Sequence, residues 1–259
     1  MRRWLAAFLL LLSLPAAAGQ TCEEQPLTPE MLRRAFDLAL ETRQALDESG
    51  AKVVILARAG QDLSKWGLSW SHAGLVVRDH PAGRWIVVHE LNDCGTAESA
   101  VYDEGLANFF ADFPIRWEGL IVTPTPEVQE ALLRALASGM ATRLHEKSYN
   151  MVAYPFSSRY QNSNQWVLEV IAAALGGPAV GNRVQAQQWL RANGYVPTSL
   201  DIPALTRLGG RVFRANIAFD DHPPAQRWAD RIDTATVESI VTFMERGRAV
   251  KKTVRAVRP

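Results

Sequence analysis

Three residues of the sequence could together form a nucleophilic site: His72, His89 and Ser163. His72 opens the first of two apolar, β-type runs and His89 nearly closes the second. In an antiparallel hairpin the start of one strand lies beside the end of the next, so the two histidines can be neighbours. Ser163 stands at the start of an apolar helix, where unpaired amides and the helix dipole stabilise an oxyanion. A nucleophile needs a base, and the base needs an orienting group. The pattern therefore makes His72 a candidate base and His89 its orienting group, and the polar cluster from Asn162 to Asn164 is where a nucleophile could lie.

The same residues also have structural interpretations. Ser163 lies between Asn162 and Asn164, directly before the apolar part of the helix. Ser and Asn are preferred helix caps whatever the function of a protein. His89, beside Glu90, could be a strand-end histidine that binds a backbone group. The residue types alone therefore leave a cap and a catalytic position open at Ser163.

Residues 1–19 have the pattern of a secretory signal peptide. Arg2 and Arg3 precede an apolar run over residues 4–14, and Pro15 leads into small residues up to Gly19. The apolar run is about half of the ~20 residues that a spanning helix needs, so a retained transmembrane helix is not expected. The pattern predicts a periplasmic or secreted protein after signal-peptide cleavage.

The mature chain would keep two cysteines, Cys22 and Cys94. In an oxidising compartment a Cys22–Cys94 disulfide is the simplest prediction, and two free, buried thiols are the alternative. The bridge would tie the new N-terminus to the centre of the fold.

Three segments in a fixed order carry a family resemblance: SHAGLVV, RWIVVHELN and, far downstream, NSNQWVLEV. This order resembles the circularly permuted branch of the NlpC-type, papain-like superfamily, which includes lecithin:retinol acyltransferase-like proteins. Within that branch, the segments WIVVHELNDCG, YDEGLANFF and NSNQWVLEV are most similar to a family of exported bacterial proteins catalogued as domain of unknown function 2145. The resemblance implies that His72 is the base and His89 its orienting group, with Ser163 at the position where the family pattern has a cysteine.

The serine at position 163 departs from that pattern and bears on function. A cysteine thiol has a pKa near ~8.5, which drops further at a helix N-terminus, whereas a serine hydroxyl needs full proton removal by its base. The resemblance and the predicted export imply a papain-like hydrolase or acyltransferase of the cell envelope, acting on an amide or ester, with weak or lost activity. The alternative is a non-catalytic periplasmic binding or scaffold protein on the same fold.

The bulk composition argues against some classes of partner. The chain has 259 residues, 47% of them hydrophobic, and a net charge of +1, so it offers no single-sign field of the kind that nucleic acid requires. Asp220, Asp221 and His222 cluster as oxygen and nitrogen ligands, but adjacent residues in a Pro-rich loop rarely converge on one ion. We therefore predict no nucleic-acid partner, no metal and no cofactor, and expect an envelope substrate or ligand.

The elements that would position these residues follow from helix starts, turns and apolar periodicity. Thr-Pro pairs start helices at residues 28 and 125, and Pro and Gly mark a hairpin turn within 79–83. Helices flanking clustered strands predict an α+β fold with an antiparallel sheet. The sequence shows no repeat, low-complexity tract or long linker, so residues 20–247 are expected to form a single domain, which the resemblance implies is a permuted papain-like one. Residues 248–259 are expected to form a basic, solvated tail. The expected helices cover residues 28–50, 102–114, 125–146, 163–176, 182–193 and 236–247, and the expected strands cover 52–58, 116–124 and 211–219, with a hairpin over 72–91.

Overall fold

A computed structural model gives the fold of the chain and describes residues 26–256. The predicted signal peptide and Cys22 lie outside the described residues, so export and the Cys22–Cys94 disulfide stay predictions. Over residues 26–256, no single helix has the length and apolar content to cross a membrane. A pair of segments bent by 90°, Ser163–Ala179 with Arg183–Ala192, passes the same test by length and composition.

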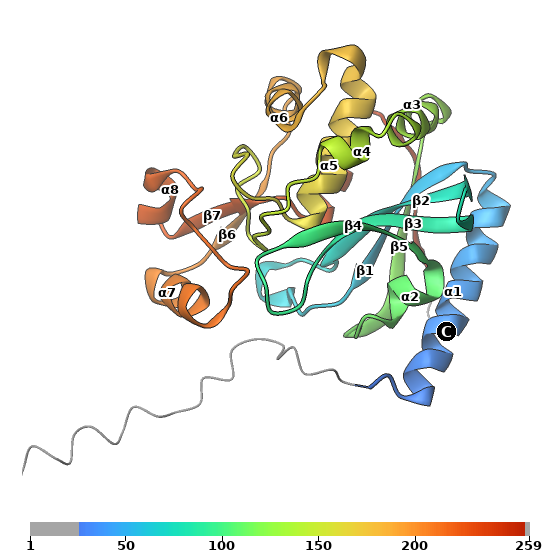
Figure 1. Cartoon of the computed structure of the whole chain (residues 1–259), viewed down its shortest axis with the longest axis horizontal. Helices are drawn as coiled ribbons and strands as arrows, with labels where there is room; N and C mark the ends of the chain where they lie inside the picture. Colours follow the sequence, from blue (N-terminus) through green and yellow to red (C-terminus); the bar gives the residue numbers. More distant parts are fainter. Residues whose placement is uncertain (1–25, 257–259) are drawn as a thin grey trace, which may run out of the picture.

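The architecture is α+β, as predicted, and is built on a six-stranded antiparallel sheet with the order β4-β3-β2-β1-β5-β8 (Figure 1). The predicted hairpin forms β2 and β3, with Leu75 opposite Val88 and His80 opposite Gly83. Apolar, β-branched runs suit strands that are covered on both faces, and β1 is buried along its whole length. The strands are β1 (Val53–Ala59), β2 (His72–His80), β3 (Gly83–Asn92), β4 (Ser99–Gly105), β5 (Arg116–Pro124) and β8 (Val250–Ala256).

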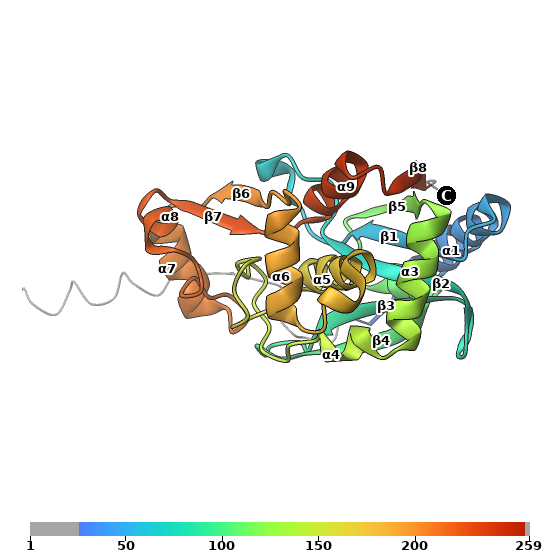
Figure 2. The same ribbon diagram turned by 90° about the horizontal axis from the view of Figure 1, so that it is seen from above.

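Helices cover both faces of this sheet (Figure 2). On one face, α1 and α2 enclose an apolar cluster around Val54, Leu56 and Trp85. On the other face, α3, α5 and α9 enclose a larger cluster around Ile55 and Leu75. Alternate residues of one strand therefore serve two separate cores, as the period of a strand requires. The bounds are α1 (Pro29–Ser49), α2 (Leu106–Ala111), α3 (Pro126–Ala137), α4 (Met140–Arg143), α5 (Ser163–Gly176), α6 (Arg183–Ala192) and α9 (Val237–Arg246), with short 3₁₀ turns at Ser64–Trp66 and Gly177–Ala179.

The helix α5 is the buried axis of the larger core. Its residues from Ser163 to Ala173 are all buried. Asn162 is its N-cap, and the Asn162 side chain accepts a hydrogen bond from the Gln165 amide at 2.7 Å. The same side chain donates to the Thr234 hydroxyl at 2.9 Å, which holds the start of the helix in place. Capping is thus done by Asn162 and leaves the Ser163 hydroxyl free for another partner.

A second, two-stranded sheet lies at the end of the molecule remote from α1 (Figure 1). The strand predicted over 211–219 is wrong, because residues 211–213 end a helix and the rest forms a loop. In that loop, Ala218 exchanges both backbone hydrogen bonds with the Asn150 side chain, so its amide and carbonyl are satisfied without a neighbouring strand. The elements here are β6 (Thr198–Asp201), α7 (Ala204–Phe213), α8 (Pro224–Trp228) and β7 (Arg231–Thr234).

The prediction of a solvated tail over 248–259 is wrong for residues 250–256, which form the edge strand β8. Val254 pairs with Ile121 and Lys252 with Thr123 along β5. These pairs provide hydrogen-bond partners for the backbone groups on the outer edge of β5. The strand therefore forms because a distant strand offers an edge, and local hydrophobicity does not predict it. Lysines are common on edge strands because their charge discourages further pairing.

Two expected helices are shorter than predicted. The helix over 125–146 breaks at Gly139, whose φ of 71° is left-handed and ends α3 before the short helix α4. The helix over 102–114 begins only at Leu106, because residues 99–105 pair with β3 as β4. The second difference matters for the site, since it places Glu104 on a strand.

Candidate functional site

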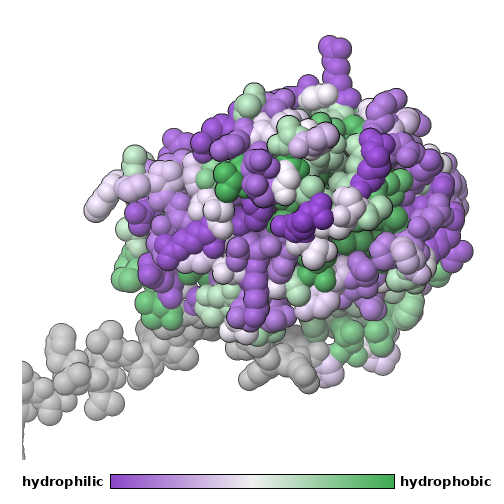
Figure 3. Space-filling model, turned by 45° about the horizontal axis from the view of Figure 1, so that its top comes forward, coloured by the Kyte–Doolittle hydropathy of each residue, from purple (hydrophilic) through white to green (hydrophobic). Residues whose placement is uncertain are grey.

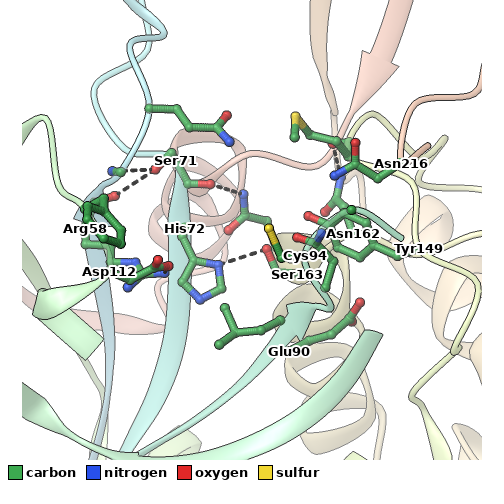
Figure 4. Close-up of a pocket in the computed structure, with 18 of the residues that line it drawn as sticks. Arg58, Ser71, His72, Glu90, Cys94, Asp112, Tyr149, Asn162, Ser163 and Asn216 are labelled. Carbon is green, nitrogen blue, oxygen red and sulfur yellow. Dashed lines mark hydrogen bonds and ion pairs between the residues drawn. The ribbon is translucent and has the colours of Figure 1, made fainter. Parts of the chain in front are cut away.

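Ser163, His72 and His89 lie together and form a continuous chain of hydrogen bonds that ends on a carboxylate. The Nδ1 atom of His72 is 2.9 Å from the Ser163 hydroxyl oxygen (Figure 4). Its Nε2 atom is 2.8 Å from Nδ1 of His89. Nε2 of His89 is 3.2 Å from a carboxyl oxygen of Glu104. The structure thus brings together all three residues singled out from the sequence and adds a fourth.

Gly74 allows the two histidines to approach. It lies two residues after His72 on β2 and faces β3. A Cβ atom at this position would come within 2.6 Å of the Val87 side chain and 3.0 Å of the Cβ atom of His89. The glycine of the SHAGLVV segment is therefore required by close packing between β2 and β3, and a larger residue would displace the orienting histidine.

Glu104 was missed in the sequence because residues 102–114 were expected to be helical. In β4, Glu104 pairs with Val87 and Tyr102 pairs with His89, so Glu104 is the diagonal neighbour of His89 on the same face of the sheet. A signal did exist: a histidine pair that activates a hydroxyl needs a final acceptor, and Glu104 is an acidic residue near the pair in the sequence.

The carboxylate end sets the direction of every hydrogen bond in the chain. The hydrogen bond with His89 lowers the pKa of Glu104, so this group is ionised at neutral pH and can only accept. His89 then donates from Nε2 and accepts at Nδ1 from the Nε2–H of His72. The Nδ1 atom of His72 is left without a proton and accepts from the Ser163 hydroxyl. This assignment follows from the network and gives His72 the tautomer that a general base needs.

The surroundings of His72 keep it neutral. Burial, the nearby Arg58 guanidinium and His89 hold the pKa of His72 well below its ordinary value. The ring of Phe109 covers both imidazoles, with centroid distances of 5.8 Å to His72 and 5.5 Å to His89. Arg58 lies 4.9 Å from the centre of the Phe109 ring and is bound by the Phe109 carbonyl and Asp112. The base form is thus available at neutral pH, while its tendency to take a proton is reduced.

Tyr149 lies on the opposite side of Ser163 from His72 (Figure 4). Burial raises the pKa of Tyr149, as does the nearby Glu90, and hydrogen bonds with the side chain and backbone of Ser163 oppose the shift. The phenol is therefore neutral and keeps a proton that it can donate. Together with the N-terminal amides of α5, it can stabilise negative charge that develops beside the Ser163 oxygen. Sequence reasoning did not find this residue.

These groups open onto a cavity of about 990 Å³. Ser163 and His72 both line it, so a ligand in the cavity can reach the nucleophile and its base. Arg214 and Asn216, from the loop after α7, form part of its wall. Cys94, the partner in the predicted disulfide, also lines the cavity (Figure 4).

Glu90 is the unusual member of the cavity wall. Its side chain is fully buried, and neither carboxyl oxygen has a hydrogen-bond partner of ordinary geometry among the described residues. Burial raises the pKa of Glu90 to about 8, and the nearby Ser99 hydroxyl only partly opposes this. The group is therefore largely protonated at neutral pH.

The acidic cluster near residue 220 does not converge on one point. Asp220 pairs with Arg159 at 2.9 Å, whereas Asp221 binds His222 at 2.9 Å. The other ring nitrogen of His222 is 3.0 Å from the Asp233 carbonyl oxygen. Among the described residues, no group of three or more His, Cys, Asp or Glu side chains could hold a metal ion.

Comparison with known proteins identifies the family. Residues 45–244, most of the chain, match the sequence model of a family described as an uncharacterized protein conserved in bacteria, DUF2145. The chain belongs to this family, as its motifs predicted. No match was found among curated proteins or among solved structures.

Proposed function

We propose that the protein is an exported, papain-like hydrolase or acyltransferase that uses Ser163 as its nucleophile on an amide or ester of the cell envelope. One observation carries this proposal: the directed chain from the Ser163 hydroxyl through His72 and His89 to Glu104. If Ser163 were only a helix cap and His72 only a structural histidine, an unprotonated Nδ1 atom of His72 would not need to face the Ser163 hydroxyl. The Glu104 carboxylate at the end of the chain would not be needed either.

The proposed reaction is acyl transfer through a covalent intermediate. The Ser163 oxygen attacks the carbonyl carbon while its proton passes to Nδ1 of His72. His89 and Glu104 stabilise the resulting imidazolium, and the α5 amides and the Tyr149 hydroxyl stabilise the oxyanion. The leaving group takes the proton from His72. Water or an acceptor alcohol or amine then attacks the acyl carbon and gives its proton to His72. The bond from the acyl carbon to the Ser163 oxygen breaks, and that oxygen takes the proton from His72, which completes hydrolysis or transfer.

The geometry is also the reason to favour the permuted papain-like assignment. A nucleophile at the first residue of a buried helix faces a base on the adjacent sheet, and the orienting group lies on the next strand. This is the arrangement that the resemblance implied. The cysteine expected at position 163 is replaced by a weaker nucleophile, and the low pKa of His72 further reduces the driving force for removing a hydroxyl proton. We therefore expect slow turnover.

A second candidate is a binding protein that kept the fold and lost turnover. The open cavity of about 990 Å³ supports it, since this volume suits a small ligand whether or not chemistry follows. The serine at position 163 is compatible with both candidates.

Covalent labelling with a fluorophosphonate, which reacts with activated serines, tests the proposal. We expect the wild-type protein to be labelled at Ser163, and Ser163→Ala to remain unlabelled. His72→Ala should slow labelling by about 10² to 10⁴, the usual contribution of a general base. His80→Ala is the matched control, because His80 lies on the same hairpin outside the hydrogen-bond chain, and its rate should be unchanged.

Two outcomes would decide against an active serine enzyme. If labelling of Ser163 proceeds at the same rate in His72→Ala, the catalytic grouping is wrong. If the wild-type protein is not labelled but Ser163→Cys reacts rapidly with iodoacetamide in a His72-dependent way, the geometry is retained and activity is lost, which favours the binding protein.

A further inference from the structure

The helix α7 presents an apolar face that no other element within residues 26–256 covers. Leu205 is 81% exposed, Leu208 59% and Val212 64%. These positions are spaced by three and four residues, so their side chains lie along one side of the helix. A soluble surface rarely carries such a row without a partner.

Trp228 extends this surface. It is 88% exposed at the end of α8. Arg207 of α7 joins the two helices, since it donates to the Arg227 carbonyl at 2.8 Å and pairs with Asp230 at 3.0 Å. Figure 1 places both helices at the end of the molecule opposite α1, and in Figure 3 hydrophobic residues come to the surface at that end.

The charged side chains of α7 itself and of its C-cap residue are all basic. Residues 203–214 contain three arginines and no acidic residue. Arg207 is paired, but Arg211 and Arg214 have no ion-pair partner among the described residues. An exposed aliphatic row flanked by unpaired arginines is the pattern of a helix that lies in the interface of an anionic membrane.

The exposed row on α1 provides a contrast within the same chain. Leu32, Phe36 and Leu40 are also exposed and evenly spaced. Their neighbours are ion pairs of both signs, among them Glu30 with Arg33 at 2.9 Å. The α1 face therefore has no net attraction for an anionic surface, whereas the α7 face does.

We propose that α7, with Trp228, docks the protein on the surface of a bilayer that contains anionic lipid. Leu205, Leu208 and Val212 enter the boundary between headgroups and acyl chains, and Arg211 and Arg214 face the phosphates. A second copy of this chain is a poorer occupant, because a symmetric contact would bring the unpaired arginines against their own copies.

This docking would bring the cavity to the membrane. The chain leaves α7 at Arg214, and Arg214, Ala215 and Asn216 line the same cavity as Ser163. A ligand that belongs to the bilayer or to its surface would then be delivered next to the cavity. The docking itself does not depend on whether Ser163 is catalytic.

Sedimentation with large vesicles tests the proposal. The full chain should sediment with vesicles of phosphatidylethanolamine containing about one-third phosphatidylglycerol, more weakly at high salt, and little with phosphatidylcholine alone. Replacing Leu205 and Leu208 together by serine should lower the partition coefficient by about tenfold or more, from the loss of two buried aliphatic side chains. Arg211→Glu should also weaken binding to the anionic vesicles.

Leu40→Ser is the matched control, since Leu40 is an equally exposed leucine on α1, and it should bind as wild type. All variants carry the same N-terminal segment, so their difference isolates α7. Equal sedimentation of the double variant and the wild type would overturn the proposal, as would equal binding to phosphatidylcholine or no binding at all. A wild-type dimer in light scattering that the double variant abolishes, without vesicle binding, would assign the face to a second copy.

Discussion

Two fully buried glutamates near the site differ in their hydrogen-bond partners. Glu169, on α5 behind the site, accepts hydrogen bonds from Gln161 at 2.6 Å, Gln187 at 2.8 Å and Arg183 at 2.8 Å. Glu90, in the cavity wall, lies near the Ser99 hydroxyl, but neither of its carboxyl oxygens has a partner of ordinary hydrogen-bond geometry among the described residues. Burial raises the pKa of both groups, but Arg183 and the glutamine side chains oppose the shift at Glu169.

This difference indicates that the surroundings of Glu169 form a structural cluster that holds α5 in place. Arg183 also donates to the Ser158 and Tyr160 carbonyls at 2.9 and 2.8 Å. The Glu169 cluster thereby holds the loop that leads into Ser163, and its polar groups are satisfied. On the cavity side, an unpartnered acid is tolerated in the neutral form. Buried groups with strongly shifted pKa values cluster at functional sites.

The largest expected loss of stability is at Glu169, in the structural cluster. Glu169→Ala leaves Arg183 buried without its carboxylate, and removal of one partner from a buried pair typically costs about 3–5 kcal/mol. We expect this loss in the free energy of unfolding measured with urea. Glu130→Ala is the control, because it breaks an exposed pair with Lys52 and should cost less than about 1 kcal/mol. If Glu169→Ala and Glu130→Ala lost the same free energy of unfolding, Glu169 would not belong to a structural cluster and its contrast with Glu90 would not hold.

A pH dependence is expected on the cavity side. The pKa of Glu90 is about 8 in the fold against 4.5 for a free carboxyl. Between these values the folded state binds more protons than the unfolded state, so stability is present below the lower pKa and is lost as pH rises through the higher one. Glu90→Gln cannot titrate and should remove this loss.

The measurement for Glu90 is urea unfolding of both proteins between about pH 5 and pH 8. Relative to wild type, Glu90→Gln should gain up to about 1.4 kcal/mol per pH unit as pH rises. The amide adds only a constant offset, which the comparison across pH removes. A difference that does not vary with pH would mean that Glu90 is ionised in the fold and has an unseen partner.

The smallest expected effect is at the nucleophile. Ser163→Ala removes the hydrogen bond to His72 and the side-chain hydrogen bond with Tyr149, so its cost should be about 1–3 kcal/mol. Capping is unaffected, because Asn162 provides it. A loss as large as that of Glu169→Ala in the same urea experiment would show that Ser163 is a structural residue and would weaken the proposed function.

The sequence predicted the elements whose limits depend on a few local residues. Thr28 and Gly50 bound α1, and Thr236 caps α9, because caps and left-handed glycines act within one turn. The failures have non-local causes. Residues 250–256 form a strand because β5 offers an open edge. Residues 211–219 do not form a strand, because α7 extends to Phe213 and the Asn150 side chain takes both backbone hydrogen bonds of Ala218.

The residues of the candidate site also fall into those predicted from local features and those that depend on distant contacts. His72, His89 and Ser163 could be grouped from the sequence, since hairpin geometry and a helix start are local features. Glu104 required the register of β4 against β3. Tyr149 lies in an irregular segment, whose path is held by contacts such as that of Gln161 with Glu169.

By itself, the sequence determined the family, the α+β class, most helices and strands, and three members of the hydrogen-bond chain, because these depend on residue order and short-range periodicity. Only the tertiary structure decided the carboxylate that orients the chain, the phenol beside the nucleophile, the contrast between Glu90 and Glu169, and the uncovered face of α7. Each of these depends on which distant residues meet, and burial and register are set only when the whole chain packs.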